Sequence, residues 1–163
     1  MIQKKIKKLE ELILLRENLK QEGKKVVTTN GSYDIVHAGH VKSLEESKAQ
    51  GDILIVGVNS DKSIQSYKSI DRPIIPQDYR AQMIAGLESV DYIFIFDEVD
   101  PIDFVGKLKP DVHTNGDDYG EDCIEAGAVK DCKGRLHLLK KYEGISTTEI
   151  IDKILGIYCK VKK

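Results

Sequence analysis

The sequence predicts an α/β fold of the doubly wound class, in which a parallel sheet carries helices on both faces. Short apolar runs alternate along the chain with segments of helical length, the order that builds strand–helix–strand units. The run ILIVGVN at 53–59 is continuously apolar up to its final Asn59, as expected for a strand buried on both faces of a parallel sheet. The segments between the runs are long enough to cross over the sheet, and such crossovers are right-handed.

The first part of the chain supplies two strands and two helices. Apolar residues spaced along one helical face predict a leading amphipathic helix within residues 1–25, which QEGKK at 21–25 ends. The β-branched segment VVTTN at 26–30 predicts the first strand. A helix is predicted from about Ala38 to Ala49, closed by Gly51, before the strand at 53–59.

The rest of the chain repeats this alternation. Residues 60–77 show no periodicity and hold two of the four prolines, so we predict a functional loop there. Ser146 is a natural N-cap for the last helix, because Glu149 follows three residues later at the capping-box spacing. The predicted elements are helices at 77–90, 101–109, 121–131 and 146–158, and strands at 92–96, 111–115 and 135–140.

Length and composition are those of an ordinary soluble protein. The 163 residues are expected to form a single domain over 1–163, with a basic tail at 158–163. The formal charge of −2 predicts no nucleic-acid partner, and no apolar run approaches the ~20 residues of a membrane span. Three cysteines without C-x-x-C spacing argue against a disulfide framework and a zinc knuckle, so the expected location is a reducing cytoplasm.

The segment TTNGSYDIVHAGHVKSL at 28–44 holds two histidines three positions apart, His37 and His40. It joins a strand to a helix, and in open parallel sheets ligands bind where such loops meet helix N-termini. Free N–H groups and the helix dipole favour an anion there, and two imidazoles on one helical turn suit phosphate oxygens. Metal ligation is a weaker alternative, because a stable site needs further ligands and Asp34 is the nearest. The third alternative is that both histidines pack in the core.

Two signatures resemble those of a known family. TNGSYDIVHAGH at 29–40 resembles the T-x-G-x-F-D-x-x-H-x-G-H signature of the cytidylyltransferase-like nucleotidyltransferases, and STTEII at 146–151 resembles their second signature, I-S-[ST]-T. Both occur in the expected order and on the expected elements. The resemblance is closest to the D-glycero-β-D-manno-heptose 1-phosphate adenylyltransferases and covers nearly the whole chain. It implies a Rossmann-like fold of the HxGH nucleotidyltransferase type.

The resemblance implies an enzyme that transfers a nucleoside monophosphate from a nucleoside triphosphate, with ATP favoured, to a sugar phosphate and releases pyrophosphate. The favoured acceptor is D-glycero-β-D-manno-heptose 1-phosphate. Its phosphate would attack the α-phosphorus in line, so catalysis would consist of positioning and charge neutralisation. Mg²⁺ is expected to arrive with the triphosphate, without a dedicated protein metal site. A homodimer is also expected, with the first helix as a candidate interface.

The resemblance also implies roles for individual residues. Catalysis is assigned to His37, His40 and Lys42, although Lys42 could equally face solvent. The nucleotide is expected to contact Thr29, Asn30, Gly31, Tyr33, Gly39, Ser146, Thr147 and Thr148. The sugar phosphate is expected to contact Asp34, Lys68, Arg72, Arg80, Asp117 and Asp118.

Four of these assignments have plain structural alternatives. Lys68 and Arg72 lie in the irregular loop and could be surface charges. Arg80 could be explained by an acidic partner inside the protein. Asp34 could order the turn by accepting hydrogen bonds from backbone N–H groups, with metal binding as the lesser alternative.

One segment departs from the heptose pattern. Where those enzymes carry K-G-G-D followed by an aromatic residue, this chain has Asn115, Gly116, Asp117, Asp118 and Tyr119. An amide in place of a cation, beside two carboxylates, favours recognition of hydroxyl groups over phosphate at that point. The same segment and YEGISTT at 142–148 are similar to the glycerol-3-phosphate cytidylyltransferases, so a polyol phosphate is the alternative acceptor. The identity of the base is left open.

Two other classes of function are compatible with the same residues. A non-catalytic nucleotide-binding module would keep the fold and the phosphate contacts but would release no pyrophosphate. A metal-dependent hydrolase that uses His37 and His40 would contain a stoichiometric amount of bound metal after purification. These outcomes separate both classes from a nucleotidyltransferase.

Overall fold

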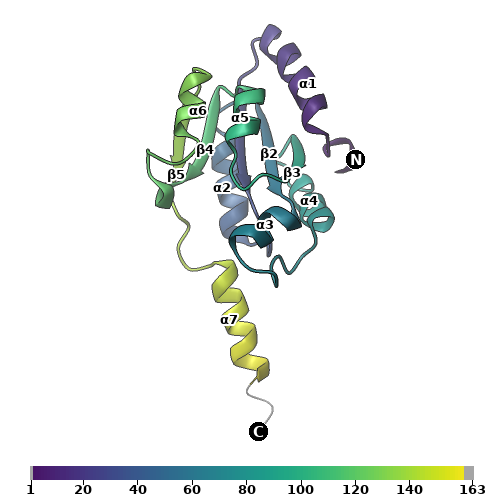
Figure 1. The fold of residues 1–163 in the computed structure, drawn as a ribbon, viewed down its shortest axis with the longest axis vertical. Helices are drawn as coiled ribbons and strands as arrows, with labels where there is room; N and C mark the ends of the chain where they lie inside the picture. Colours follow the sequence, from purple (N-terminus) through teal and green to yellow (C-terminus); the bar gives the residue numbers. More distant parts are fainter. Residues whose placement is uncertain (1, 160–163) are drawn as a thin grey trace.

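The computed structural model describes residues 2–159 and has one sheet of five strands at its centre (Figure 1). The strand order is β3-β2-β1-β4-β5, and every neighbouring pair is parallel. The chain builds outward from β1 to β3 on one side and then returns to β4 on the other, so the order reverses beside β1. The strands are β1 (Val26–Gly31), β2 (Ile53–Asn59), β3 (Tyr92–Phe96), β4 (Val112–Gly116) and β5 (Arg135–Leu139).

Helices join the strands and confirm the predicted α/β alternation. No helix among residues 2–159 combines the length and the apolar composition that crossing a lipid bilayer requires. The α-helices are α1 (Leu9–Gln21), α2 (Ala38–Lys48), α3 (Asp61–Tyr67), α4 (Gln77–Ala85), α5 (Ile102–Leu108), α6 (Ala126–Asp131) and α7 (Thr147–Tyr158). Two short 3₁₀ helices, η1 (Ile2–Lys4) and η2 (Asp117–Tyr119), complete the described elements.

The two faces of the sheet bury separate apolar layers. Val26 of β1 and Ile55 of β2 pack in a layer with α1, α5 and α6. Their neighbours Val27 and Val56 pack in the opposite layer, with α2 and α4. Successive strand residues point to opposite faces, so an uninterrupted apolar strand feeds both layers. The prediction of helices on both faces is confirmed.

The predicted leading helix is wrong for residues 2–8. Ile6 forms a parallel bridge to Ile93, and the backbones of Lys5 and Lys7 exchange hydrogen bonds with Ile93 at 2.9 Å each. These residues therefore extend the edge of the sheet beside β3, and α1 begins only at Leu9. Apolar spacing alone could not reveal this, because the partner strand lies far along the chain.

Other element boundaries also differ from the prediction, and the helix predicted at 77–90 ends at Ala85. Residues 60–77 were predicted to be irregular, but they contain α3, whose N-cap Ser60 accepts a hydrogen bond from the backbone N–H of Ser63 at 3.1 Å. The helix predicted at 121–131 begins only at Ala126. The basic tail predicted at 158–163 lies outside the described residues from position 160 onward.

Helix α7 projects away from the rest of the molecule (Figure 1). None of its residues is buried, and several large apolar side chains along it are half exposed. Its N-cap is Ser146, as predicted, because the Ser146 hydroxyl accepts a hydrogen bond from the backbone N–H of Glu149 at 3.2 Å. The N-cap Ser146 also lines the cavity described next, so the N-terminus of α7 lies beside that cavity.

Candidate active site

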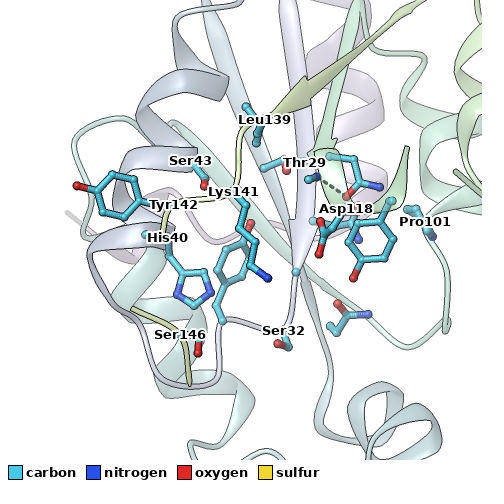
Figure 2. A pocket seen from close by; sticks show the side chains of 18 of the residues that line it. Thr29, Ser32, His40, Ser43, Pro101, Asp118, Leu139, Lys141, Tyr142 and Ser146 are labelled. Carbon is cyan, nitrogen blue, oxygen red and sulfur yellow. Dashed lines mark hydrogen bonds between the residues drawn. The ribbon is translucent and has the colours of Figure 1, made fainter. Parts of the chain in front are cut away.

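A cavity of about 590 Å³ lies at the carboxyl ends of β1, β4 and β5, beside the point where the strand order reverses. Open parallel sheets place their ligand sites at such a point, and the volume falls within the ~300–1,000 Å³ of small-molecule sites. Figure 2 shows side chains from several distant segments turned toward this space. The lining residues come from 29–33, 37–43, 59, 67–68, 99–101, 115–125 and 139–146.

The two histidines lie together in the cavity wall. His37 is the N-cap residue of α2 and His40 lies three residues further on, with their imidazole rings stacked at a centroid distance of 3.9 Å. Gly39 permits this arrangement, because a Cβ atom at that position would lie only 3.0 Å from Cε1 and Nδ1 of His37. The H-x-G-H spacing therefore places two rings at the N-terminus of α2, where backbone N–H groups favour an anion.

Both imidazoles are neutral at pH 7 in the free protein. Burial, reinforced by His37 and Lys68, lowers the pKa of His40 to about 4. Burial also lowers the pKa of His37, against the opposing charge of Glu149. The backbone N–H of His37 points to Nδ1 of His40 at 3.4 Å, which leaves the proton of the neutral ring on Nε2. His40 can therefore donate a hydrogen bond to a phosphate oxygen without first being charged.

Tyr33 supports the histidine pair from below. Its ring is buried and meets His40 edge-on at a centroid distance of 5.3 Å. The backbone of Tyr33 has φ of 47°, in the left-handed region that side chains rarely adopt. Gly31 makes room for the ring, because a Cβ there would lie 3.0 Å from Cζ of Tyr33. Gly31 and Tyr33 of the first signature therefore form the surface against which His40 packs.

Asp34, Arg72 and Arg80 do not line the cavity, although each was predicted to contact the sugar phosphate. The carboxylate of Asp34 accepts hydrogen bonds from Arg72 Nε at 2.6 Å and from the backbone N–H groups of Ile74 and Ile75 at 2.7 and 2.9 Å. Asp34 thus organises residues 72–75 of the following loop, which agrees with the structural alternative for it.

Arg80 is fully buried and has three internal acceptors. Its guanidinium pairs with Asp61 at 2.7 Å and donates to the carbonyl oxygens of Ile75, at 2.8 Å, and Ser32. Ser32 belongs to the cavity lining and precedes Tyr33. Arg80 therefore reaches the cavity only through the backbone that it holds in place.

The two predicted lysines occupy different positions. Lys68 lines the cavity and donates to the hydroxyl of Ser32 at 3.1 Å. Lys42 does not line it, and its ammonium lies 4.3 Å from the ring centroid of Tyr142 in a cation–π contact. Lys68 is therefore placed to meet a bound anion, whereas Lys42 holds Tyr142 at the mouth of the cavity.

Of the two predicted acidic residues and the residues of the second signature, some line the cavity and others do not. Ser146 and Asp118 line the cavity, but Thr147, Thr148 and Asp117 do not. Asp117 instead accepts a hydrogen bond from the backbone N–H of Lys141 at 3.2 Å, which ties η2 to the segment before α7. The predicted residues that do line the cavity are Thr29, Asn30, Gly31, Tyr33, His37, Gly39, His40, Lys68, Asp118 and Ser146.

Several lining residues were not singled out from the sequence. The most prominent is Lys141, whose side chain extends into the cavity from the segment between β5 and α7 (Figure 2). Its signal was the KKYEGISTT stretch itself, because two lysines lie a few residues before the second signature. Tyr142 belongs to the same stretch, while Glu125 carried no signal because it reaches the site only through the placement of α6.

No group of three or more His, Cys, Asp and Glu side chains within residues 2–159 is arranged to hold a metal ion. The cysteines in the same part of the chain, Cys123, Cys132 and Cys159, form no disulfide.

The comparisons with known proteins agree with this geometry. The model of the cytidylyltransferase-like family matches residues 28–153. The chain is 44% identical over 155 residues to the bifunctional protein HldE of Geobacter metallireducens, with 94% of the chain and 32% of the relative covered. It is 47% identical over 152 residues to the HldE protein of Campylobacter jejuni subsp. doylei, at 93% and 32% coverage. The chain therefore spans about a third of the length of these curated relatives.

Two solved structures share the fold. The lipopolysaccharide core biosynthesis protein of Thermoplasma volcanium has a TM-score of 0.61 and 29% identity, covering 76% of this chain and all of the other. The pantoate-β-alanine ligase of Francisella tularensis also has a TM-score of 0.61 but only 17% identity, over 93% of this chain and 78% of the other, so it supports the fold alone. The family match includes both signatures and all of the residues that line the cavity. The chain belongs to the cytidylyltransferase-like family.

Proposed function

We propose that the protein is a nucleotidyltransferase that moves a nucleoside monophosphate from a nucleoside triphosphate, with ATP favoured, to a sugar phosphate. The favoured acceptor is D-glycero-β-D-manno-heptose 1-phosphate, and the second product is pyrophosphate. The observation that carries this proposal is the stacked pair His37 and His40 at the N-terminus of α2, in one cavity with the N-cap of α7. Two helix N-termini beside neutral donor imidazoles suit a polyphosphate.

The chemistry would be an in-line displacement at the α-phosphorus. An oxygen of the acceptor phosphate forms the new P–O bond, and the bond between the α-phosphorus and its bridging oxygen to the β-phosphorus breaks. The electron pair of that bond leaves with pyrophosphate, so no covalent protein intermediate is needed. His40 would donate from Nε2 to the phosphoryl oxygens, and Lys68 and Lys141 would balance the charge that develops on the leaving group.

The remaining cavity residues would fix the two substrates. Thr29, Asn30 and Gly31 end β1 beside the histidines and would carry the nucleotide along their backbone. Ser146 would present its hydroxyl and the first N–H groups of α7 to the phosphates, with Thr147 and Thr148 completing that turn. Asp118 would accept hydrogen bonds from the sugar.

The sugar class of the acceptor is supported by the resemblance to the heptose enzymes and by one solved relative. The Thermoplasma volcanium structure with 29% identity is described as a lipopolysaccharide core biosynthesis protein. Both observations favour a sugar phosphate over a polyol phosphate. The segment Asn115–Tyr119 is the feature that keeps glycerol 3-phosphate as the alternative acceptor.

Three further properties form part of the proposal. Mg²⁺ would enter bound to the triphosphate, because triphosphates usually carry this ion with most of its shell filled by water. The location would be the cytoplasm, in keeping with cysteines that form no disulfide.

The protein would form a homodimer, which sedimentation velocity would detect. Helix α1 buries Leu12 and Leu19 in the core, so α7, with Ile154 and Leu155 half exposed, is a better candidate interface.

The decisive experiment is a matrix assay of pyrophosphate release. ATP, CTP, GTP and UTP are each combined with heptose 1-phosphate, glycerol 3-phosphate and other sugar or polyol phosphates. We expect the highest turnover with ATP and heptose 1-phosphate. Turnover of CTP with glycerol 3-phosphate would select the alternative, and no release with any pair would refute the proposal in favour of a binding module.

A further inference from the structure

We infer that Asn115 is a specificity-determining residue that donates a hydrogen bond to a hydroxyl group of the acceptor, and that Glu125 is the positioning residue that fixes the Asn115 amide. Asn115 lies near the end of β4 and Glu125 just before α6, and both line the cavity. The inference rests on the proposed function, because it assigns the acceptor side of the same cavity.

The orientation of the Asn115 amide is set by two contacts. Its Nδ2 donates to Oε1 of Glu125, and its Oδ1 accepts the backbone N–H of Gly116 at 2.9 Å. If the amide flipped, its oxygen would face the carboxylate and its NH₂ group would face the N–H of Gly116, so the flipped form is disfavoured. Glu125 uses one of the two Nδ2 hydrogens. The other is the donor that Asn115 can offer to a bound molecule.

The side chain of Glu125 is positioned by a contact with a buried residue of the sheet. Its side chain is only 2% exposed, and its Oε1 lies 3.6 Å from Nε2 of the fully buried His113. The other ring nitrogen of His113 lies 2.8 Å from the hydroxyl of Thr28, on the neighbouring strand β1. Burial raises the pKa of Glu125, but the nearby His113 and other neighbouring polar groups outweigh this effect and hold the pKa below its usual value. The carboxylate is therefore ionised at neutral pH.

A buried carboxylate is costly unless its surroundings supply donors. Among the described residues, Nε2 of His113 makes no hydrogen bond within normal limits, so Glu125 is incompletely paired in the direction of the sheet. Asn115 is the partner that joins this charge to the cavity. A chain of contacts from Thr28 through His113 and Glu125 thus ends on an amide that faces the ligand space.

The chemistry of this wall selects neutral hydroxyl groups rather than phosphate. Asp118 and Glu125 bring two carboxylates to the lining, and like charge would repel a phosphate there. A sugar hydroxyl can accept from the Asn115 amide and donate to a carboxylate at the same time. A site built in this way rejects analogues that lack the hydroxyl, because its own polar groups are then left unpaired.

The test compares the acceptor KM and the triphosphate KM in three variants, using the acceptor that the wild type turns over best. Asn115→Ala and Glu125→Ala should each raise the acceptor KM by about 10- to 100-fold, the scale of one lost hydrogen bond in a dry site, with the triphosphate KM unchanged. In the double variant Asn115→Asp with Glu125→Gln, the Gln can donate to the Asp. The melting temperature of this double variant should return to that of the wild type. The acceptor KM should stay high, because a carboxylate replaces the amide that donates the hydrogen bond.

Deoxy analogues of the acceptor identify the hydroxyl concerned. The analogue that lacks the hydroxyl bound by Asn115 should bind the wild type weakly. Its KM should not rise further in the Asn115→Ala variant. Asn18→Ala on α1 and Glu121→Gln serve as controls outside the cavity and should leave both KM values unchanged. An unchanged acceptor KM in folded Asn115→Ala would overturn the inference, as would recovery of that KM in the double variant. A wild type that uses no acceptor would instead refute the proposed function, and the inference with it.

Discussion

The two walls of the cavity differ in charge and in construction. The wall formed by α2, the C-terminal end of α3 and the segment before α7 presents His37, His40, Lys68, Lys141 and Ser146, which are hydrogen-bond donors or cations. The wall formed by β4 and the residues leading into α6 presents Asn115, Asp118 and Glu125, which bring two carboxylates and one amide. The first wall suits an anion and the second suits a neutral polyhydroxyl group. The electrostatic field of the cavity therefore favours binding the phosphates at the first wall and the sugar at the second.

The walls are also held together differently. The histidine wall depends on close steric fits, in which Gly31 and Gly39 make room for Tyr33 and His37. The opposite wall depends on a buried polar chain from Thr28 to Asn115. Steric fits are disturbed by added volume, whereas polar chains are disturbed by a single change of donor or acceptor. The comparison predicts that mutations on the histidine wall affect the reaction rate or the affinity for the triphosphate, and that those on the other wall affect the acceptor KM.

The largest effect is expected for His40→Ala. Loss of a donor to the phosphoryl group should lower kcat by about 30- to 1,000-fold, or roughly 2 to 4 kcal/mol in the barrier. Steady-state pyrophosphate release measures this directly. His137→Ala is the matched control, because His137 lies on β5 outside the cavity lining, near Glu46. Full activity of the His40 variant would remove the proposed role of the stacked pair.

Lys141→Ala is expected to have the next largest effect. A charged hydrogen bond to phosphate contributes about 1.5–3 kcal/mol, so the affinity for ATP should fall about tenfold or more. Titration calorimetry at two salt concentrations should also show that the wild type loses more affinity in high salt than the variant. Lys130→Ala on α6 provides a lysine control outside the cavity. Equal salt dependence of wild type and variant would contradict a contact between Lys141 and the triphosphate.

Gly39→Ala tests the steric construction of the histidine wall. The new methyl group would meet the His37 ring at 3.0 Å, so the ring must move and the stacked pair should open. We expect a several-fold loss in kcat, on the order of 1 kcal/mol, measured in the same pyrophosphate assay. Gly106→Ala is the control, because Gly106 is also helical but has no atom within 4 Å of its added Cβ. The control should keep full activity and gain about 0.5–1 kcal/mol in stability.

The smallest effect is expected in the dependence of stability on pH. The pKa of His40 is about 4 in the folded protein, below its ordinary value of 6.5. Between these values the unfolded chain binds more protons, so the contribution of His40 to stability is complete above pH 6.5 and is lost as the pH falls toward 4. Melting temperatures measured over this range should fall more steeply for the wild type than for His40→Gln. Parallel curves would contradict the lowered pKa.

Most of the fold follows from local sequence. The run at 26–30 is mostly β-branched and the run at 53–59 is mostly apolar, and both form strands of the central sheet. Helix α3 was missed because its stability comes from distant partners, including the ion pair of Asp61 with Arg80. The edge bridge between Ile6 and Ile93 was missed for the same reason. Periodicity detects elements that bury one face, but it does not detect those stabilised by a few long-range contacts.

The same distinction between local and long-range contacts applies to the residues of the site. The histidines, Gly39 and Ser146 were found because each belongs to a short segment in which a strand end or a helix N-terminus brings the residues together. Glu125 was missed because α6 carries it to the cavity from another part of the chain. Arg80 and Asp34 were recognised as charged residues near the signature, but their ion pairs with Asp61 and Arg72 place them outside the lining.

Local sequence is enough to predict the alternation of strands and helices, the chain position of the two histidines and the capped start of α7. These features depend on backbone geometry and on residues within a few positions of one another. Which charges face the cavity depends on long-range contacts, because an arginine or carboxylate that finds an internal partner is removed from the ligand space. That pairing depends on strand order and helix placement, which bring together residues such as His113 and Thr28 that are far apart in the chain.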